Sequence, residues 1–198
     1  IRDGAQVKVA SRRGAIELAA KVDDLVDQGV IFIPFHFFEA AANAGGMMTY
    51  GVPEHRLPRK VVKWEIDSIK KMGVEIKTNS AVKNPEDLKK KGYNAVFVAV
   101  GAQNSARLNI AGEDSTGVVQ ALAFLKDVNS GKKPPVGKKV VVVGGGSVAM
   151  DAATCALRLG AGSVQVVCLE CDPEEMPAQE EEIAQAMEEG IKVDMSWG

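Results

Sequence analysis

The sequence predicts an α/β fold organised around a doubly wound parallel sheet, and three features of one stretch support this. Four consecutive valines, Val140–Val143, are typical of a strand that is buried on both faces. A glycine-rich turn follows at residues 144–146, and the next residues, to Leu159, have the spacing of a helix that ends at Gly160. A second apolar run at residues 163–169 then completes the start of a βαβ unit.

The turn carries a sequence pattern that is suited to binding a dinucleotide. Gly144, Gly146 and Ala149 form the spacing G-x-G-x-x-A. The first glycine permits a tight turn, the second lets the backbone approach a pyrophosphate, and the alanine lets helix and strand pack closely. The helix start directs free N–H groups and the positive end of its dipole at the phosphates. We therefore expect dinucleotide contacts from Gly144, Gly145, Gly146, Ser147 and Val148. The alternative is a glycine-rich turn that binds no ligand.

Composition and charge narrow the function classes. The 198 residues are 46% hydrophobic and 25% charged, which is ordinary for a globular protein with one good core or two small ones. A net charge of −2 gives no electrostatic reason to expect nucleic acid or an anionic membrane as a partner. No apolar run approaches the roughly 20 residues of a membrane span. An odd number of cysteines and the lack of a signal peptide favour a reducing, cytoplasmic compartment.

Both ends of the chain look cut, because Ile1 is not an initiator methionine and Gly198 closely follows a predicted strand at residues 191–195. We therefore expect a fragment of a longer protein. The remaining elements are predicted from periodicity and turn residues. They are strands at 7–10, 15–22, 30–33, 74–78 and 94–102, of which the last is buried, a hairpin turn at 12–14, and helices at 60–72, 85–91 and 118–128.

Several short motifs occur in a fixed order along the second part of the chain. They are GMMTYGVP from Gly46, RLP from Arg56, KMGV from Lys71, AVFVAVGA from Ala95, GED from Gly112 and EMPA from Glu175. In these motifs residues 45–198 resemble the flavin-containing small subunit of glutamate synthase. Related modules occur in dihydropyrimidine dehydrogenase and electron-bifurcating transhydrogenases. The resemblance implies FAD and a pyridine nucleotide as cofactors, with Gly46 near the isoalloxazine ring and Gly101 near the flavin's dinucleotide.

The chain departs from that family in what it lacks. The family's first FAD fingerprint would stand upstream of Gly46, and neither its cysteine-rich iron-sulfur domain nor the later FAD-contacting segment is present in this sequence. A flavin site built from residues 45–103 alone would have no pyrophosphate cradle. The resemblance therefore implies an FAD site that is incomplete in this chain. It also implies an iron-sulfur or other electron-transfer subunit as partner. Assembly of the chain into a homo-oligomer is a further possibility that the sequence does not decide.

Glu170 bears on the choice of dinucleotide. It ends the predicted strand and lies near the position at which an acidic residue accepts the ribose hydroxyls of NAD. In the NADP-using relatives this place typically carries an arginine pair, whereas this chain has Leu169 and Glu170 with no arginine nearby. We expect NAD(H) rather than NADP, with Glu170 on the adenosine ribose. The alternative is that Glu170 is a solvated charge at a strand end.

Residues 1–44 have a different character. They contain DG at Asp3, SRRG at Ser11 and PFHF at Pro34, and the last of these runs on to Asn43. In these motifs the segment resembles the C-terminal molybdopterin-dinucleotide-binding domain of enzymes of the formate dehydrogenase type. The resemblance implies His36 and Asn43 as contacts on the pterin side, but His36 with its phenylalanine neighbours equally suits a small core. This segment cannot perform formate chemistry by itself, because the metal-ligating parts of such an enzyme are absent from it.

Other polar residues are given ordinary roles. Asp151 lies one turn into the predicted helix, where its carboxylate interacts favourably with the helix dipole. It is a candidate to position the residues that would contact the dinucleotide, without touching the dinucleotide itself. The glutamates at 174–175 and 180–182 are expected to be the solvated start of a helix that begins at Pro177 and turns Ile183, Ala184 and Met187 inward. Cys168 and Cys171 form a single C-x-x-C, which excludes four-thiolate zinc within this chain, and no metal site is predicted.

The sequence thus predicts three parts. These are a β-rich segment at 1–44, a partial FAD domain at 45–103 and a Rossmann domain at 104–198 that is incomplete at its C-terminal end. The predicted function is hydride transfer between NAD(H) and FAD, with electrons passed to iron-sulfur partners and no acid-base residue required of the protein. One alternative is a fragment of a molybdopterin-dependent formate dehydrogenase. The other is a dinucleotide-binding interaction or regulatory module without enzymatic activity.

Overall fold

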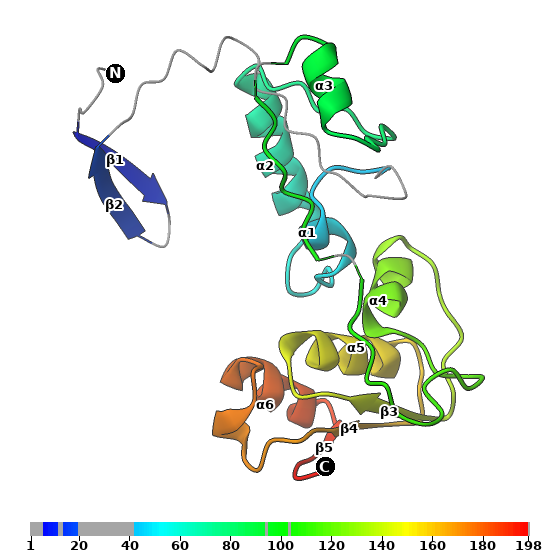
Figure 1. Cartoon of the computed structure of the whole chain (residues 1–198). Coiled ribbons are helices and arrows are strands. Elements are labelled where there is room, and N and C mark those ends of the chain that lie inside the picture. The colour runs from blue at the N-terminus through cyan, green and yellow to red at the C-terminus, as the bar shows by residue number, and fades with distance from the viewer. Residues whose placement is uncertain (1–5, 12–13, 20–41, 94, 103, 198) are drawn as a thin grey trace.

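The computed structural model describes residues 6–11, 14–19, 42–93, 95–102 and 104–197 (Figure 1). β1 (Gln6–Ser11) and β2 (Gly14–Ala19) form an antiparallel hairpin with Gln6 opposite Ala19. The first two predicted strands are confirmed over these ranges. The strand predicted at 30–33 and the candidate residue His36 lie outside the described residues.

A parallel sheet lies at the centre of the second half of the chain. β3 (Lys139–Val143), β4 (Ser163–Val167) and β5 (Lys192–Asp194) pair in that order. α5 (Ser147–Arg158) connects β3 to β4, and η1 (Pro173–Glu175) with α6 (Glu180–Glu188) connects β4 to β5. Parallel strands need such crossovers, so the predicted βαβ unit and the strand predicted at 191–195 are confirmed.

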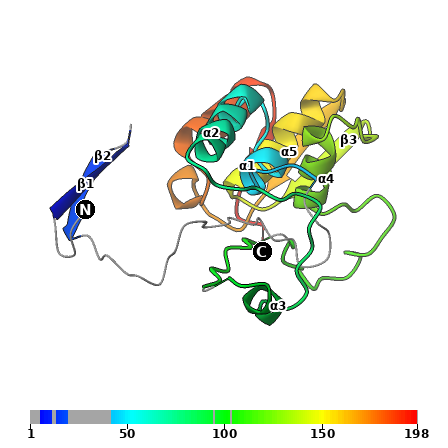
Figure 2. The same cartoon turned by 90° about the horizontal axis from the view of Figure 1, so that it is seen from above.

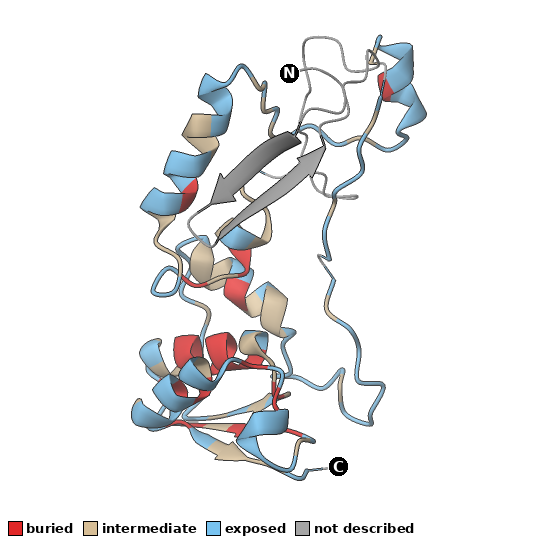
Figure 3. Cartoon of the chain, turned by 90° about the vertical axis from the view of Figure 1, so that its left-hand side faces the viewer, coloured by how far each residue is buried: buried red, intermediate tan, exposed pale blue. Residues whose placement is uncertain are grey.

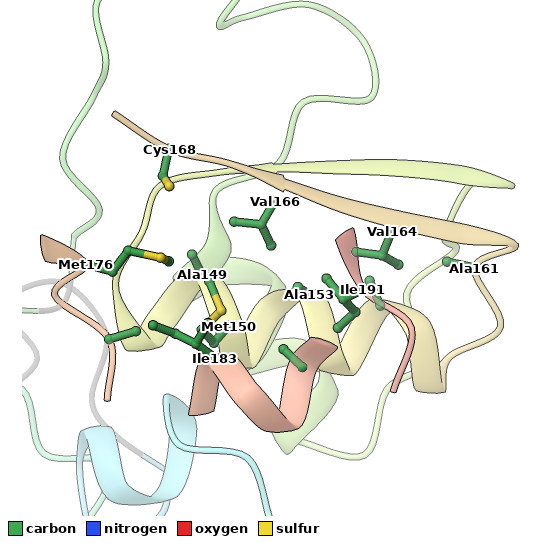
Figure 4. Close-up of a cluster of buried hydrophobic side chains, with 13 residues drawn as sticks. Ala149, Met150, Ala153, Ala161, Val164, Val166, Cys168, Met176, Ile183 and Ile191 are labelled. Carbon is green, nitrogen blue, oxygen red and sulfur yellow. The ribbon is translucent and has the colours of Figure 1, made fainter. Parts of the chain in front are cut away.

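The main core lies between this sheet and the two helices that cover one of its faces (Figure 4). Val164 and Val166 of β4 are 2% and 0% exposed and face α5, where Ala153 is fully buried. Ile183 of α6 closes the same cluster. The small residues of α5 allow the helix to lie close to the strands. Every residue of α5 from Ala149 to Ala156 is buried.

The opposite face of the sheet is open among the described residues. Val141 and Val143 of β3 are 59% and 56% exposed. The prediction that β3 is buried on both faces is therefore wrong for the described chain, because both described crossover helices pack on the same side. The predicted fold class is confirmed as α/β with a small parallel sheet, whereas its second helical layer is not seen in the described residues.

Residues 42–102 carry three helices, α1 (Met47–Tyr50), α2 (Arg59–Lys71) and α3 (Glu86–Lys90). α1 packs against α2 and against α4 (Ala121–Asn129), and α4 packs against α5 (Figures 1 and 2). Leu125 of α4 is 1% exposed in that second contact. The helices predicted at 60–72, 85–91 and 118–128 are thereby confirmed, with shifts of a few residues at their ends.

Two predicted strands in this region are wrong. Residues 74–78 and 95–102 form no strand among the described residues (Figure 3). Phe97 is 82% exposed. An apolar run becomes a buried strand only when neighbouring strands complete its hydrogen bonds and a layer covers each face. The described sheets, β1-β2 and β3-β4-β5, do not include these residues.

The inward face of α6 also differs from the prediction. Ile183 is buried as expected, but Met187 is 55% exposed and Ala184 lies on the surface, while Ala186 is fully buried. A small side chain at Ala186 lets α6 approach α5 closely, so packing against the neighbour decided which stripe turned inward. Among the described residues, no helix combines the length and apolar character that crossing a membrane requires.

Candidate dinucleotide-binding site

The candidate site is the turn between β3 and α5. Gly144 has a positive φ of 127°, a conformation that side-chain-bearing residues rarely adopt. Its N–H donates to the carbonyl oxygen of Val167 at 2.8 Å, which ties the turn to the end of β4. Gly146 is the N-cap of α5 and has extended backbone without a capping side chain. The carbonyl oxygen of Gly146 accepts from the N–H of Ala149 at 2.8 Å, so the helix starts directly behind the turn.

Each glycine of the turn has a different space around it. A Cβ on Gly146 would meet no atom within 4 Å, so backbone is open to a ligand there. A Cβ on Gly145 would stand 2.5 Å from Oε2 of Glu170 and 3.2 Å from Cβ of Cys168. Gly145 therefore has no room for a side chain unless the Glu170 carboxylate moves.

Glu170 lies beside this turn with a carboxylate oxygen that is left without a partner. Its Oε2 is buried from solvent and has no hydrogen bond in the protein. The backbone of Glu170 is held by the N–H of Ser196, which donates to the Glu170 carbonyl oxygen at 2.8 Å. Buried carboxylate oxygens are normally satisfied, so this atom is suited to accept a hydrogen bond from a ligand hydroxyl.

The loop after Glu170 is fastened to the same turn. The N–H of Ala178 donates to the carbonyl oxygen of Gly145 at 3.1 Å. Within the loop, Asp172 Oδ1 caps η1 by accepting from the N–H of Glu175 at 3.0 Å, and Met176 is buried in the main core. Sequence reasoning missed Ala178 as part of the site, because a backbone hydrogen bond leaves no signal in the side-chain pattern.

The surroundings of the site are acidic. No lysine or arginine occurs between Arg158 and Lys192, a stretch that includes β4, the loop beside the turn and α6. Glu180 and Glu181 at the start of α6 are exposed, as expected for a solvated helix start. The same prediction is wrong for Glu182, whose side chain is 12% exposed because it pairs with Arg56. The helix begins at Glu180 and not at Pro177. A ligand carrying an additional phosphate near Glu170 would find no positive side chain from this stretch.

Asp151 is buried behind the site, in the second turn of α5. It is 6% exposed, and its Oδ2 accepts a hydrogen bond at 2.8 Å from Nη1 of Arg56. Burial raises the pKa of Asp151 above its ordinary value, while the ion pair with Arg56 acts in the opposite direction. Arg56 was not among the candidate residues from the sequence, because it precedes its partner by 95 positions.

The cysteines of the site region are poor nucleophiles. Burial raises the pKa of Cys155 to about 11. Burial, together with the neighbouring carboxylate of Glu170, raises the pKa of Cys168 as well. A thiol of raised pKa holds little thiolate near neutral pH, so these two side chains serve packing. The described residues contain no group of three or more His, Cys, Asp or Glu side chains placed to hold a metal ion.

The two glycines expected near a flavin lie elsewhere in the described chain. Gly46 has a φ of 53° and precedes α1, and a Cβ there would meet no atom within 4 Å. Gly101 has a φ of 67° and is exposed in the segment 95–102, which forms no strand among the described residues. The structure thus brings Gly145 and Glu170 together, whereas Gly46 and Gly101 belong to other segments and their roles stay predictions.

Comparison with protein families gives two matches. Residues 85–195 match the model described as Pyridine nucleotide-disulphide oxidoreductase. Residues 1–61 match the model described as Molydopterin dinucleotide binding domain. Both resemblances inferred from the sequence are thereby confirmed at the level of the family.

Curated relatives agree with these matches. The chain is 43% identical over 159 residues to NADP(+)-dependent formate dehydrogenase subunit beta of Moorella thermoacetica, covering 78% of this chain and 22% of that protein. It is 38% identical over 154 residues to NADPH-Fe(3+) oxidoreductase subunit beta of Geobacter sulfurreducens, covering 75% and 23%. It is 34% identical over 168 residues to the glutamate synthase [NADPH] small chain of Escherichia coli, covering 78% and 35%.

The chain therefore spans roughly a fifth to a third of the length of these relatives. Among solved structures it is similar to a 2-naphthoyl-CoA reductase in complex with 2-naphthoyl-CoA, with a TM-score of 0.63 over 79% of this chain and 23% of that one. Their sequences are 19% identical, so this likeness describes the fold alone.

Proposed function

We propose a function from one premise: this chain belongs to the pyridine nucleotide-disulphide oxidoreductase family and is part of an FAD/NAD(P)-dependent oxidoreductase. The proposal is that the turn 144–146 binds the pyrophosphate of NAD(H) and that the protein transfers hydride between NAD(H) and FAD. Electrons then pass to an iron-sulfur or other electron-transfer subunit. Three relatives named above are subunits or a small chain of larger enzymes, which supports a partner of this kind.

The chain's own residues fit a dinucleotide. The open space over Gly146 admits a phosphate to the backbone, and the first N–H groups of α5 point out of the helix start. When bound, the nicotinamide supplies the hydride chemistry, and the protein contributes binding and orientation. Burial of Cys155 and Cys168 and the raised pKa of each thiol give no support to a redox-active cysteine.

The observation that carries the choice of NAD(H) is the buried, unpartnered Oε2 of Glu170 beside Gly145. A carboxylate there accepts the ribose hydroxyls of NAD and repels the 2′-phosphate of NADP. The relatives' names carry NADP, so this preference would be a difference from them. The absence of basic residues between Arg158 and Lys192 supports the same preference.

The test is to measure dissociation constants for NADH and NADPH with the wild-type protein and with Glu170→Arg. We expect wild-type protein to bind NADH at least about 10-fold more tightly than NADPH, and the variant to reverse the order. Tighter binding of NADPH by the wild-type protein would overturn the preference. Binding of neither nucleotide would overturn the assignment of the site.

The FAD prediction has its own readout. A visible flavin spectrum that bleaches when NADH is added without oxygen would support hydride transfer. A colourless protein that still binds NADH would instead support the alternative of a dinucleotide-binding interaction module.

The alternative of a fragment of a molybdopterin-dependent formate dehydrogenase is supported by the first part of the chain. Residues 1–61 match a molybdopterin dinucleotide binding domain. Pterin and metal found in the purified full protein would support this alternative.

We also propose a cytoplasmic location for the protein. The free thiols of Cys155, Cys168 and Cys171 support this proposal.

A further inference from the structure

The turn that contains His55 and Arg56 sits over the contact between α5 and α6. The N–H groups of Arg56 and Leu57 donate to the carbonyl oxygen of Pro53 at 3.1 and 3.0 Å, which rigidifies this turn. The guanidinium of Arg56 then bridges two helices. Its Nη1 donates to Oδ2 of Asp151 on α5 at 2.8 Å, and its Nη2 donates to Oε1 of Glu182 on α6.

Both acceptors depend on this guanidinium. The side chains of Asp151 and Glu182 are only 8% and 12% exposed. The other oxygen of Glu182, Oε2, is buried without a partner. Two buried carboxylates side by side are costly without a shared cation, so loss of Arg56 would leave uncompensated negative charge against the binding helix.

His55 belongs to the same turn and is partly buried. Burial, followed by the positive charge of Arg158, lowers the pKa of His55. The geometric link between this turn and helices α5 and α6 is the bridge that Arg56 makes to Asp151 and Glu182.

The position of these contacts connects the two cofactor regions. Asp151 follows the turn 144–146 on the same helix, and Arg56 belongs to the segment that begins at Gly46 and runs through α1. Hydride transfer requires donor and acceptor atoms within about 3–3.5 Å in a defined orientation. A rigid link between the two segments would supply this requirement.

We propose that Arg56 is a positioning residue that holds the flavin-side segment 46–58 in one orientation on the dinucleotide-binding helix α5. Arg56 acts through Asp151 and Glu182. The role in hydride transfer rests on the proposed function, whereas the link between segments does not.

The kinetic test uses the full-length protein with its flavin and three variants. Arg56→Gln removes the bridging charge, and Arg56→Lys keeps a charge that reaches one carboxylate at a time. Arg158→Gln is the matched control, because it removes an ion pair between α5 and Glu189 without detaching Arg56. Stopped-flow absorbance gives the rate of flavin reduction by NADH, and a separate titration gives the dissociation constant of NADH.

For Arg56→Gln we expect the reduction rate to fall at least about 10-fold while the dissociation constant changes less than about 2-fold. Arg56→Lys should recover part of the rate, and Arg158→Gln should leave both quantities within about 2-fold. A wild-type rate in Arg56→Gln, or an equal loss in Arg158→Gln, would overturn the proposal.

Hydrogen exchange supplies a readout that needs no activity. In the wild-type protein the amides of Arg56 and Leu57 should be protected, and Arg56→Gln should speed their exchange at least about 10-fold, unlike Arg158→Gln. Unchanged protection in Arg56→Gln would overturn the link. If wild-type flavin is not reduced by either nucleotide, the proposed function fails, and exchange still decides whether Arg56 fixes the segment.

Discussion

Replacing Gly145 by alanine separates the contribution of Glu170 to nucleotide binding from that of the proposed phosphate-binding turn. The new Cβ would stand 2.5 Å from Oε2 of Glu170, closer than nonbonded atoms approach. Backbone strain does not interfere, because Gly145 is not among the glycines of positive φ. The carboxylate is the end of a flexible side chain and moves aside at little cost, whereas Cβ of the buried Cys168, at 3.2 Å, has to shift by a few tenths of an ångström. We expect the free energy of unfolding to fall by about 1 kcal/mol.

The binding of NADH should respond much more than stability does. A displaced carboxylate no longer accepts the ribose hydroxyl, and a hydrogen bond to a charged group contributes about 1.5–3 kcal/mol. This corresponds to a loss of about 10- to 100-fold in the affinity for NADH. NADPH gains no hydrogen bond from this carboxylate in our proposal, so its affinity should change little. The ratio of NADH to NADPH affinity therefore falls.

Titration calorimetry with both nucleotides gives this ratio, and a double-mutant cycle with Glu170→Ala tests its cause. In the Glu170→Ala background the added methyl group meets no carboxylate, so Gly145→Ala should cost little further affinity. Gly146→Ala is the contrasting variant, because its Cβ enters open space where a phosphate would lie and should weaken both nucleotides alike. Additive losses in the cycle, or equal losses for NADH and NADPH in Gly145→Ala, would refute the reasoning.

Three further outcomes are expected. Leu125→Ala should lower the free energy of unfolding by about 2–5 kcal/mol in a denaturant titration, because Leu125 is 1% exposed between α4 and α5; a loss below about 1 kcal/mol would contradict this packing. Cys171 is exposed, whereas Cys155 is buried and its pKa is raised to about 11. Alkylation near pH 8, followed by mass spectrometry, should therefore modify Cys171 before Cys155. Equal labelling of the two thiols would argue against the burial of Cys155. Arg158 lowers the pKa of Glu189 below its ordinary 4.5, so this pair stabilises the fold above that pH and the stabilisation disappears as pH falls through the lowered pKa. Arg158→Gln should therefore show a flatter decline of stability in acid than the wild-type protein, and an unchanged decline would exclude this pair as a cause.

Local patterns were sufficient for the elements whose partners are close in sequence. The glycine turn, α5 and β4 form one continuous unit, and the spacing of Gly144, Gly146 and Ala149 predicted its course. Helix α2 was predicted from its periodicity alone, although Trp64 on it remains 60% exposed. Such elements depend on hydrogen bonds and steric preferences within a few residues, which the sequence states directly.

The chain at 95–102 shows the limit of the same reasoning. Its apolar run is like that of β3, yet it forms no strand among the described residues, because pairing depends on segments that are distant along the chain. Packing also selected Ala186 and not Met187 for the inside of α6. In both cases the deciding neighbour lies on another element.

The sequence by itself determined that a glycine-rich turn with the spacing G-x-G-x-x-A stands between a strand and a helix, and it placed an acidic residue, Glu170, at the end of the next strand. Only the tertiary structure showed that this carboxylate closes over Gly145 with one oxygen unpartnered, and that Arg56 reaches Asp151 across 95 positions. The reason is physical. Backbone preferences act between near neighbours in the chain, whereas charge pairing and burial are decided by which distant segments the fold brings into contact.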